Sequence, residues 1–200
     1  MIRPIVFAAG LGTRMGAIKA LIPIDEVPAI ARLLQTIAAA GLSSPMVVLG
    51  RDAEEIQSRV DLAGCQVVVN EHPEDGLSSS MKLALGSLND TDEGLLTFLV
   101  DMPYLDVTSI RAVLTAVSRG ATLAAPYYEA KRGFPVYFHR CWIAELKNSL
   151  CGDSGGRRFL GKHNEHLVRV DVTDPGSVFD LDCPSDLITW KGVHACAINE

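Results

Sequence analysis

The sequence lacks an excess of basic residues. Its 200 residues include 18 Lys and Arg against 24 Asp and Glu, which gives a formal net charge of −6. A protein that binds a phosphate-rich polymer needs a basic face, so the composition predicts no nucleic-acid partner. A small anion remains a candidate ligand, because a few local cations and backbone N–H groups are enough to bind it.

Long apolar runs are also missing. No segment reaches the roughly 20 apolar residues of a membrane span, and the first apolar run, Ile5–Ala9, leads directly into a glycine loop. We therefore expect no membrane association, no secretory signal and a cytoplasmic location. The five cysteines contain no C-x-x-C pair, which favours incidental or buried thiols over a disulfide or zinc framework: Cys65, Cys141, Cys151, Cys183 and Cys196.

The pattern of apolar segments is typical of a compact α/β protein. Hydrophobic residues make up 48% and charged residues 21% of the chain, and this length fits one domain. We assign residues 1–192 to a single domain and 193–200 to a C-terminal tail. Short apolar runs alternate with longer helical segments, which predicts a mostly parallel sheet covered on both faces. The predicted strands are 4–8, 46–49, 66–69, 95–100, 121–125, 134–138 and 167–170, and the predicted helices are 28–40, 53–60, 79–87, 108–118, 142–148, 156–163 and 184–191.

The loop after the first predicted strand carries the strongest functional signal. Gly10, Gly12 and Gly16 allow the backbone to turn tightly and to approach a ligand closely. Such a loop can point several N–H groups at an anion. Arg14 and Lys19 add positive charge to the same loop, and the arginine can grip phosphate oxygens with both arms of its guanidinium group. The loop therefore predicts phosphate binding, against the alternative of a plain turn with surface cations.

Two familiar glycine loops do not fit this segment. The dinucleotide-binding fingerprint needs a glycine where Met15 stands. A P-loop needs a lysine directly after its glycine, but Gly16 is followed by Ala17. Phosphate binding here must use a different framework.

Acidic residues follow apolar or extended segments further along the chain. Asp101 comes after the run Leu95–Val100, at the strand edge where open α/β sheets place their sites. A carboxylate there suits a hard divalent cation such as Mg²⁺, and a helix cap is the alternative. Asp180 and Asp182 point to the same side if their segment is extended, so the residues alone leave the choice between them open.

The pattern A-A-G-x-G-x-R-M-G-x-x-K over residues 8–19 closely resembles the opening signature of the nucleotidyltransferases that finish molybdenum cofactor. It is most similar to the molybdenum cofactor cytidylyltransferase branch, because the guanylyltransferase branch usually has glycine at the position of Ala9. The resemblance covers roughly residues 4–190. Its further motifs are, in order, 70–80, 99–103, 132–135, 152–156 and 180–184.

This resemblance implies a Rossmann-like three-layer α/β/α sandwich with a mostly parallel mixed sheet, of the nucleotide-diphospho-sugar transferase type. It implies an enzyme that uses Mg²⁺ to transfer CMP from CTP to the terminal phosphate of molybdopterin (molybdenum) cofactor, with release of pyrophosphate. Alternatives are GMP transfer from GTP, transfer to a sugar or polyol phosphate, and a non-catalytic module that delivers the cofactor. The same resemblance implies transient contact with a molybdenum hydroxylase apoenzyme, and it leaves the oligomeric state open.

The resemblance also assigns residues. Arg14, Lys19 and Asp101 would be catalytic, and Asp101 and Asp182 would bind the metal, with Asp180 behind them. Departures from the family pattern are Val100, Cys183 and Phe134, the last on the expected acceptor side. The nucleotide-binding set is Ala8, Ala9, Gly10, Leu11, Gly12, Thr13, Arg14, Lys19, Gly76, Ser78, Ser79 and Ser80. The acceptor-binding set is Gly133, Phe134, Pro135, Asp153 and Ser154.

Three of these assignments have alternatives in the sequence itself. The serines 78–80, expected near the nucleobase, could equally cap a helix. The loop of Asp153 and Ser154 could be a helix-starting turn. Arg157 and Arg158 could meet an anionic acceptor or lie on a solvated helix face.

Overall fold

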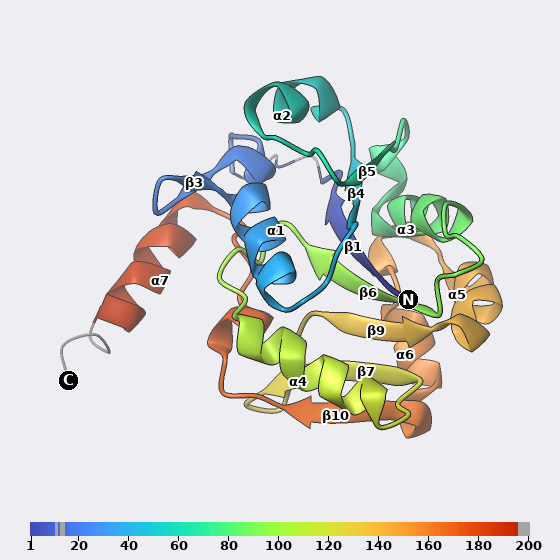
Figure 1. The fold of residues 1–200 in the computed structure, drawn as a ribbon. Coiled ribbons are helices and arrows are strands. Elements are labelled where there is room, and N and C mark those ends of the chain that lie inside the picture. The colour runs from blue at the N-terminus through green and yellow to red at the C-terminus, as the bar shows by residue number, and fades with distance from the viewer. Residues whose placement is uncertain (11, 13–14, 196–200) are drawn as a thin grey trace.

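The computed structural model describes residues 1–10, 12 and 15–195, and within them an eight-stranded sheet forms the centre of the molecule (Figure 1). Along the sheet the strands follow the order β10-β7-β9-β6-β1-β4-β5, and β8 pairs with β7. β8 and β9 are antiparallel to their neighbours, and the other pairings are parallel. The strands are β1 (Ile2–Ala8), β4 (Met46–Leu49), β5 (Gln66–Val69), β6 (Gly94–Leu99), β7 (Leu123–Tyr128), β8 (Lys131–Arg132), β9 (Val136–His139) and β10 (Leu167–Asp171).

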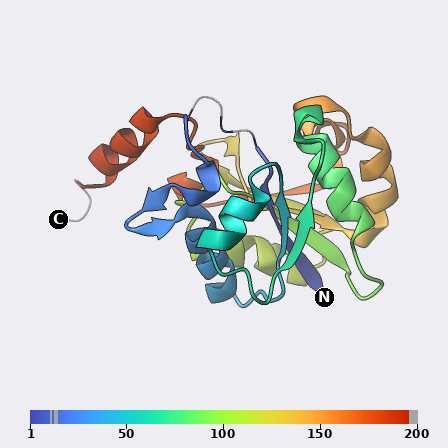
Figure 2. The same ribbon diagram turned by 90° about the horizontal axis from the view of Figure 1, so that it is seen from above.

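Helices cover both faces of this sheet (Figures 1 and 2). One layer consists of α1 (Ala29–Ala39), α2 (Ala53–Arg59) and α4 (Val107–Ser118). The other consists of α3 (Leu77–Gly86), α5 (Ile143–Ser149) and α6 (Arg157–Lys162). The predicted three-layer α/β/α sandwich with a mostly parallel mixed sheet is therefore confirmed.

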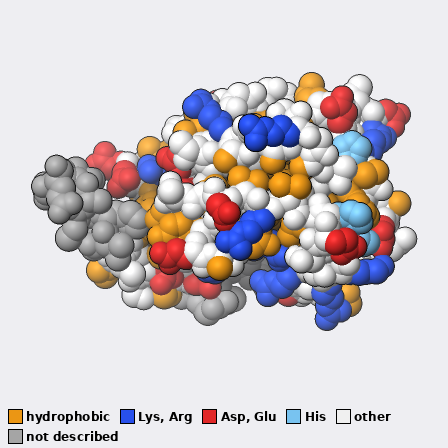
Figure 3. All heavy atoms as spheres, turned by 90° about the horizontal axis from the view of Figure 1, so that it is seen from below, with side chains coloured by type: hydrophobic (Ala, Val, Ile, Leu, Met, Phe, Trp, Pro, Cys, Tyr) orange, Lys and Arg blue, Asp and Glu red, His pale blue; other side chains and the backbone are white. Residues whose placement is uncertain are grey.

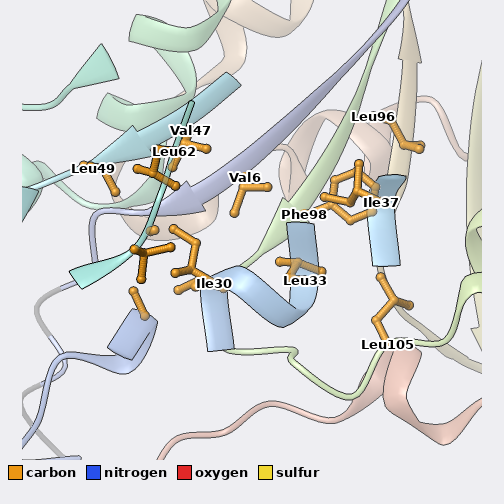
Figure 4. Packing of buried hydrophobic residues seen from close by; sticks show 14 of the residues in the cluster. Val6, Ile30, Leu33, Ile37, Val47, Leu49, Leu62, Leu96, Phe98 and Leu105 are labelled. Atoms are coloured by element: carbon orange, nitrogen blue, oxygen red, sulfur yellow. The ribbon is translucent and has the colours of Figure 1, made fainter. Parts of the chain in front are cut away.

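The central strands are apolar throughout because alternate side chains enter different cores. In β1, Val6 packs on the side of α1 and Phe7 on the side of α3. Figure 4 shows Ile30 and Leu33 of α1 near Val6 in the first of these cores. Complete burial of one such side chain contributes roughly 1.5–3 kcal/mol, so both layers are held on the sheet mainly by apolar contact.

A last helix, α7 (Pro184–Ala195), stands off one end of the sandwich beside the hairpin of β2 (Pro23–Ile24) and β3 (Val27–Pro28) (Figure 2). Trp190 of this helix stacks on Tyr104 with 4.2 Å between the ring centroids. The helix extends beyond the predicted end at residue 191, so residues 193–195 of the expected tail are helical. Residues 196–200 lie outside the described part of the chain.

The structure contains every predicted strand and helix with boundaries that differ by a few residues. The short strands β2, β3 and β8 were not predicted, because two residues are too few to show an alternating pattern. None of the described helices has the length and the apolar character needed to cross a membrane.

A buried ion pair lies at the end of the sheet where β1 and β6 begin. Arg3 Nε lies 3.2 Å from Asp92 Oδ1, and the two side chains are 9% and 1% exposed. Arg3 Nη1 also donates to the carbonyl oxygen of Ser44 (2.8 Å), and Asp92 Oδ2 accepts from the backbone N–H of Asn89 (2.8 Å). Because both charges are buried, each depends on the other for compensation.

We predict that Asp92→Ala lowers the free energy of unfolding by about 3–5 kcal/mol, because it leaves the Arg3 charge buried without its partner. The matched control is Asp90→Ala, which removes an exposed carboxylate paired with Arg140 and should cost less than about 1 kcal/mol. Urea unfolding followed by circular dichroism measures both values. Equal losses in the two variants would contradict the assignment of Arg3 and Asp92 as a structural pair.

Candidate functional site

The carboxyl ends of β1 and β6 open onto a cleft of about 800 Å³. Several segments far apart in the sequence form its walls: the first loop, the end of β6, the start of α3, β8 with the residues after it, and the loops around residues 153 and 180. Among the residues predicted to form the site, twelve line this cleft: Ala8, Ala9, Gly10, Gly12, Lys19, Gly76, Ser80, Asp101, Gly133, Phe134, Asp153 and Asp182.

Lys19 is the charged centre of the cleft. Its Nζ donates to Asp182 Oδ1 at 2.6 Å and to Asp101 Oδ2 at 3.4 Å. The lysine side chain is only 15% exposed, against 27% for Asp101 and 41% for Asp182. Three segments that are distant in the sequence therefore meet at one partly buried ammonium group, and the two predicted metal ligands face each other across it.

Burial and neighbouring charges shift the pKa values of three groups in this centre, Lys19, Asp101 and Asp180. Burial opposes the charge of Lys19, but its contacts with Asp182 and Asp101 outweigh burial and raise its pKa. Burial raises the pKa of Asp101 despite the neighbouring lysine. Desolvation within the cleft, followed by the charge of Asp101, also raises the pKa of Asp180, although its side chain is open to solvent. A further cation would relieve the carboxylates.

The position of Asp182 is fixed by the start of α7. Asp186 Oδ2 accepts from the backbone N–H groups of Asp182 (2.8 Å) and Cys183 (2.7 Å), as an acidic residue does in the third position of a capping box. These hydrogen bonds lower the pKa of Asp186. The backbone N–H of Leu181 donates to the carbonyl oxygen of Asp101 at 2.7 Å, which joins this segment to the end of β6. Of the two aspartates between which the sequence left the choice of metal ligand open, Asp182 is the one that accepts a hydrogen bond from Lys19.

The first loop brings backbone close to the same centre. Gly12 has φ +56°, and a Cβ at this position would lie 2.8 Å from the carbonyl oxygen of Ala17, so a side chain would be strained here. The short 3₁₀ helix η1 (Lys19–Leu21) follows and carries the lysine. Leu11, Thr13 and Arg14, which the resemblance assigns to nucleotide binding, lie outside the described residues.

The opposite wall is built where Asp153 meets the start of α3. Asp153 Oδ1 accepts from the backbone N–H of Leu77 at 3.1 Å, and a Cβ on Gly76 would lie 2.9 Å from the backbone of Asp153. Asp153 therefore caps a helix that begins 76 residues earlier. The alternative in which one of the serines 78–80 is the N-cap is wrong, because α3 begins at Leu77 and the serines lie in its first turn.

Asn70 orders these serines. Its Nδ2 donates to Ser79 Oγ (2.8 Å) and to Ser80 Oγ (2.9 Å). Ser80 lines the cleft, whereas Ser78 and Ser79 are not among its lining residues. The hydroxyl of Ser78 is buried without a hydrogen-bond partner in the described chain. The arrangement leaves Ser80 as the serine best placed to meet a ligand.

Only some of the residues predicted to bind the acceptor line the cleft. Gly133 and Phe134 line the cleft, but Pro135 and Ser154 do not, and Ser154 Oγ donates locally to the carbonyl oxygen of Cys151 (2.8 Å). Of the two arginines left open, Arg157 lines the cleft and Arg158 does not. Two further cations of the lining were not predicted, because they lie on the two-residue strand β8: Lys131 and Arg132.

The described residues contain no group of three or more His, Cys, Asp or Glu side chains arranged to hold a metal. The four described cysteines are free thiols, and two of them, Cys141 and Cys151, are exposed. Asp101 and Asp182 therefore provide a two-carboxylate site at most, which suits an ion that takes its other ligands from water and substrate phosphates, as Mg²⁺ commonly does.

Comparison with known proteins gives a consistent picture. The family model described as MobA-like NTP transferase domain matches residues 4–167. The chain is 28% identical to nicotine blue oxidoreductase of Paenarthrobacter nicotinovorans, covering 89% of this chain and 90% of that protein. It is 25% identical to molybdenum cofactor cytidylyltransferase of Escherichia coli K12, covering 94% of each.

A solved structure shares the fold over nearly the whole length. Rv0371c of Mycobacterium tuberculosis H37Rv aligns with a TM-score of 0.84 at 26% identity, covering 94% of this chain and 95% of that one. A second structure of Rv0371c is a complex with manganese and aligns with a TM-score of 0.77, covering 94% of this chain and 96% of that one.

We predict that two carboxamide variants change the melting temperature at pH 7 in opposite directions. Because the pKa of Asp101 is raised in the folded state, the native protein binds this proton more tightly than the unfolded chain, and stability falls as pH rises above about 3.8. Asp101→Asn should therefore have a higher melting temperature than the wild type at pH 7, and the difference should shrink as the pH is lowered towards 4.

Asp186→Asn is the matched control, because the pKa of Asp186 is lowered. This variant should melt below the wild type at pH 7, and its deficit should also shrink at low pH as the wild-type carboxylate is protonated. Thermal melts from about pH 2 to pH 8 test the pair, because the deficit of Asp186→Asn shrinks only below about pH 3.8. A lower melting temperature for Asp101→Asn at pH 7 would contradict our account of the desolvated carboxylate.

We also predict that Asp153→Ala lowers the free energy of unfolding by about 0.5–2 kcal/mol, the usual effect of losing an N-terminal helix cap. Asp153→Asn keeps a side-chain acceptor and should lose less. Ser154→Ala, which removes a hydroxyl from the same loop, serves as the control in denaturant unfolding. If Ser154→Ala costs as much as Asp153→Ala, the cap does not explain the loss.

Proposed function

The chain belongs to the MobA-like NTP transferase domain family, and on this basis we propose that it transfers CMP from CTP to the terminal phosphate of molybdopterin (molybdenum) cofactor and releases pyrophosphate. Nucleotidyl transfer as the general reaction follows from the family. The observation that carries the specific proposal is the ammonium group of Lys19 held between Asp101 and Asp182 directly after the glycine loop.

The choice of CTP rests on two observations. The chain is similar over 94% of its length to a protein named molybdenum cofactor cytidylyltransferase, and Ala9 stands where the guanylyltransferase branch usually has glycine.

The volume of the cleft, about 800 Å³, is in the upper part of the range for small-molecule sites. It therefore offers room for a nucleotide together with a second substrate.

We assign the two ends of the nucleotide to the two walls. The triphosphate would lie against the backbone of Gly10 and Gly12 and the ammonium group of Lys19, because this wall combines close backbone approach with positive charge. The nucleobase would lie at the start of α3, against Gly76 and Ser80. We propose that Arg14 also binds the phosphates, as the family resemblance predicts.

The carboxylates fit a divalent cation. Asp101 and Asp182 supply carboxylate oxygens, the ligands that hard divalent cations prefer. We propose Mg²⁺, and the manganese complex of the similar protein Rv0371c supports a divalent ion of this kind. When bound, such an ion would neutralise phosphate charge and so help the attack on the α-phosphorus.

Lys19 has two sets of partners in this scheme. Without a nucleotide, its ammonium group donates hydrogen bonds to Asp101 and Asp182. Once other positive charge satisfies these carboxylates, the ammonium group becomes available to the phosphate oxygens and stabilises the departing pyrophosphate. No side chain has to act as a general base, because a phosphomonoester is already mostly dianionic at neutral pH. The residues therefore catalyse by positioning and by charge neutralisation.

We predict that Lys19→Ala lowers kcat/KM for the nucleotide by about 10- to 150-fold, which corresponds to losing one charged hydrogen bond worth roughly 1.5–3 kcal/mol. Asp101→Ala should abolish metal-dependent turnover. The control is Lys131→Ala, since Lys131 lines the cleft but donates to the carbonyl oxygen of Val178 (2.7 Å). Pyrophosphate release is measured with each of the four NTPs, Mg²⁺ and purified cofactor.

The highest rate should be obtained with CTP. The highest rate with GTP would favour GMP transfer. Turnover only with a sugar or polyol phosphate would show that such a compound is the acceptor in place of the molybdopterin cofactor. No pyrophosphate from any NTP, together with tight binding of the cofactor, would replace the proposal with a delivery module. Transient contact with a molybdenum hydroxylase apoenzyme, which would receive the finished cofactor, stays a prediction.

The similarity to nicotine blue oxidoreductase favours one second candidate, a redox reaction in the same cleft. The first loop offers no dinucleotide fingerprint, because Met15 occupies the third glycine position. Titration with NADPH separates the candidates. Binding of NADPH and bleaching of a dye substrate without any pyrophosphate release would favour the redox reaction.

A further inference from the structure

Most of the arginines that the structure describes have a hydrogen-bond or ion-pair partner. Arg59 pairs with Glu55 at 2.8 Å, Arg169 with Asp171 at 2.7 Å, and Arg140 with Asp90 at 3.1 Å. Figure 3 shows basic and acidic side chains interspersed on one face of the molecule. Arg132 and Arg157 differ, because both line the cleft and neither has a carboxylate or hydrogen-bond partner within the part of the chain that the structure describes.

The two arginines project from a rigid base. Arg132 pairs with Tyr127 in the ladder between β8 and β7, and the next residue, Gly133, approaches Ser177 so closely that a Cβ would overlap its carbonyl oxygen. Phe134, two residues after Arg132, and Phe159, two residues after Arg157, pack in one hydrophobic cluster. A shared core therefore holds the backbone beneath both guanidinium groups.

The two arginines add positive charge to the cleft beyond that of Lys19. Both line the cleft, and neither pairs with a carboxylate among the described residues, whereas Lys19 contacts Asp101. The cleft thus contains two cationic side chains besides the ammonium group of Lys19.

A half-buried guanidinium group without a counter-ion is unfavourable unless an anion completes it. Arg132 is half-buried and Arg157 is exposed, whereas Lys131, next to Arg132, already donates to the carbonyl oxygen of Val178. The planar donor fork of arginine matches the oxygens of a phosphate group. Two such forks line the same cleft.

We propose that Arg132 and Arg157 form a phosphomonoester subsite, which holds the attacking phosphate of the acceptor apart from the triphosphate at Lys19. The inference rests on the proposed function for the identity of the acceptor. It assigns the acceptor class by its charge: a compound with a terminal phosphate in its dianionic form. Its organic part is held by the neighbouring Gly133 and Phe134.

The test measures binding, so it does not depend on turnover. The protein is saturated with α,β-methylene CTP and Mg²⁺, and phenyl phosphate is titrated by calorimetry, with phenol as the uncharged control ligand. Arg132→Gln and Arg157→Gln should each raise the Kd for phenyl phosphate about tenfold or more, as expected for the loss of a charged hydrogen bond. Arg158→Gln is the matched control, since Arg158 adjoins Arg157 but does not line the cleft. The Kd of this variant for phenyl phosphate should differ from the wild-type value by less than about twofold.

Two further measurements separate a specific subsite from general charge. The Kd of the CTP analogue should change less than about twofold in all three variants. Arg132→Lys and Arg157→Lys should recover only part of the affinity, because lysine keeps the charge and loses the fork. Thermal melts confirm that the variants are folded, and a variant that does not fold is replaced by its lysine counterpart in the comparison.

The proposal is overturned if the wild type does not bind phenyl phosphate, if Arg158→Gln weakens binding as much as Arg157→Gln, or if the substitutions weaken the CTP analogue instead. These outcomes are distinct from a failure of the proposed function. A protein that releases no pyrophosphate from any NTP, yet binds phenyl phosphate through Arg132 and Arg157, would have the subsite without the proposed reaction.

Discussion

The contact of one ammonium group with two carboxylates is the interaction on which the cleft depends. Lys19 reaches Asp101, 82 residues later, and Asp182, 163 residues later, at 3.4 Å and 2.6 Å. Without the lysine, two acidic side chains would face each other in a partly desolvated space, and the pKa of Asp101 is raised even with the lysine present. The centre therefore keeps a desolvated carboxylate at a cost in stability, as active sites commonly do, and the proposed function would use its negative charge to hold a cation beside a triphosphate.

The fold supplies the rigid frame for this contact. β1 and β6 are parallel neighbours in the middle of the sheet, with Phe7 opposite Leu99 at their carboxyl ends. The loop that carries Lys19 and the turn that carries Asp101 therefore leave the sheet side by side. The third partner comes from the segment before α7. This helix stands off the sandwich, but its capping residue Asp186 and the stacking of Trp190 on Tyr104 hold Asp182 in place, which makes a peripheral helix part of the site.

The sequence predicts those parts of the site that depend on local patterns. The apolar runs predict the long strands, and a strand followed by a glycine loop or by Asp101 predicts where the cleft opens. Tertiary contacts determine what it could not resolve. The contact of Lys19 with Asp182 depends on the hydrogen bonds that Asp186 accepts and on the bond from Leu181 to Asp101. Asp153 caps a helix from a distant segment, and β8, which carries Arg132, is too short for any periodic signal. The roles of the site residues remain predictions, and those of Leu11, Thr13 and Arg14 also lie outside the described residues.

The most direct test of this account is a crystal structure with α,β-methylene CTP and Mn²⁺, in which anomalous scattering locates the metal. We expect one manganese peak at the carboxylates of Asp101 and Asp182, the triphosphate along the first loop, and Lys19 Nζ within hydrogen-bond distance of a phosphate oxygen. Manganese and nucleotide bound away from these carboxylates, with Lys19 still between Asp101 and Asp182, would contradict it.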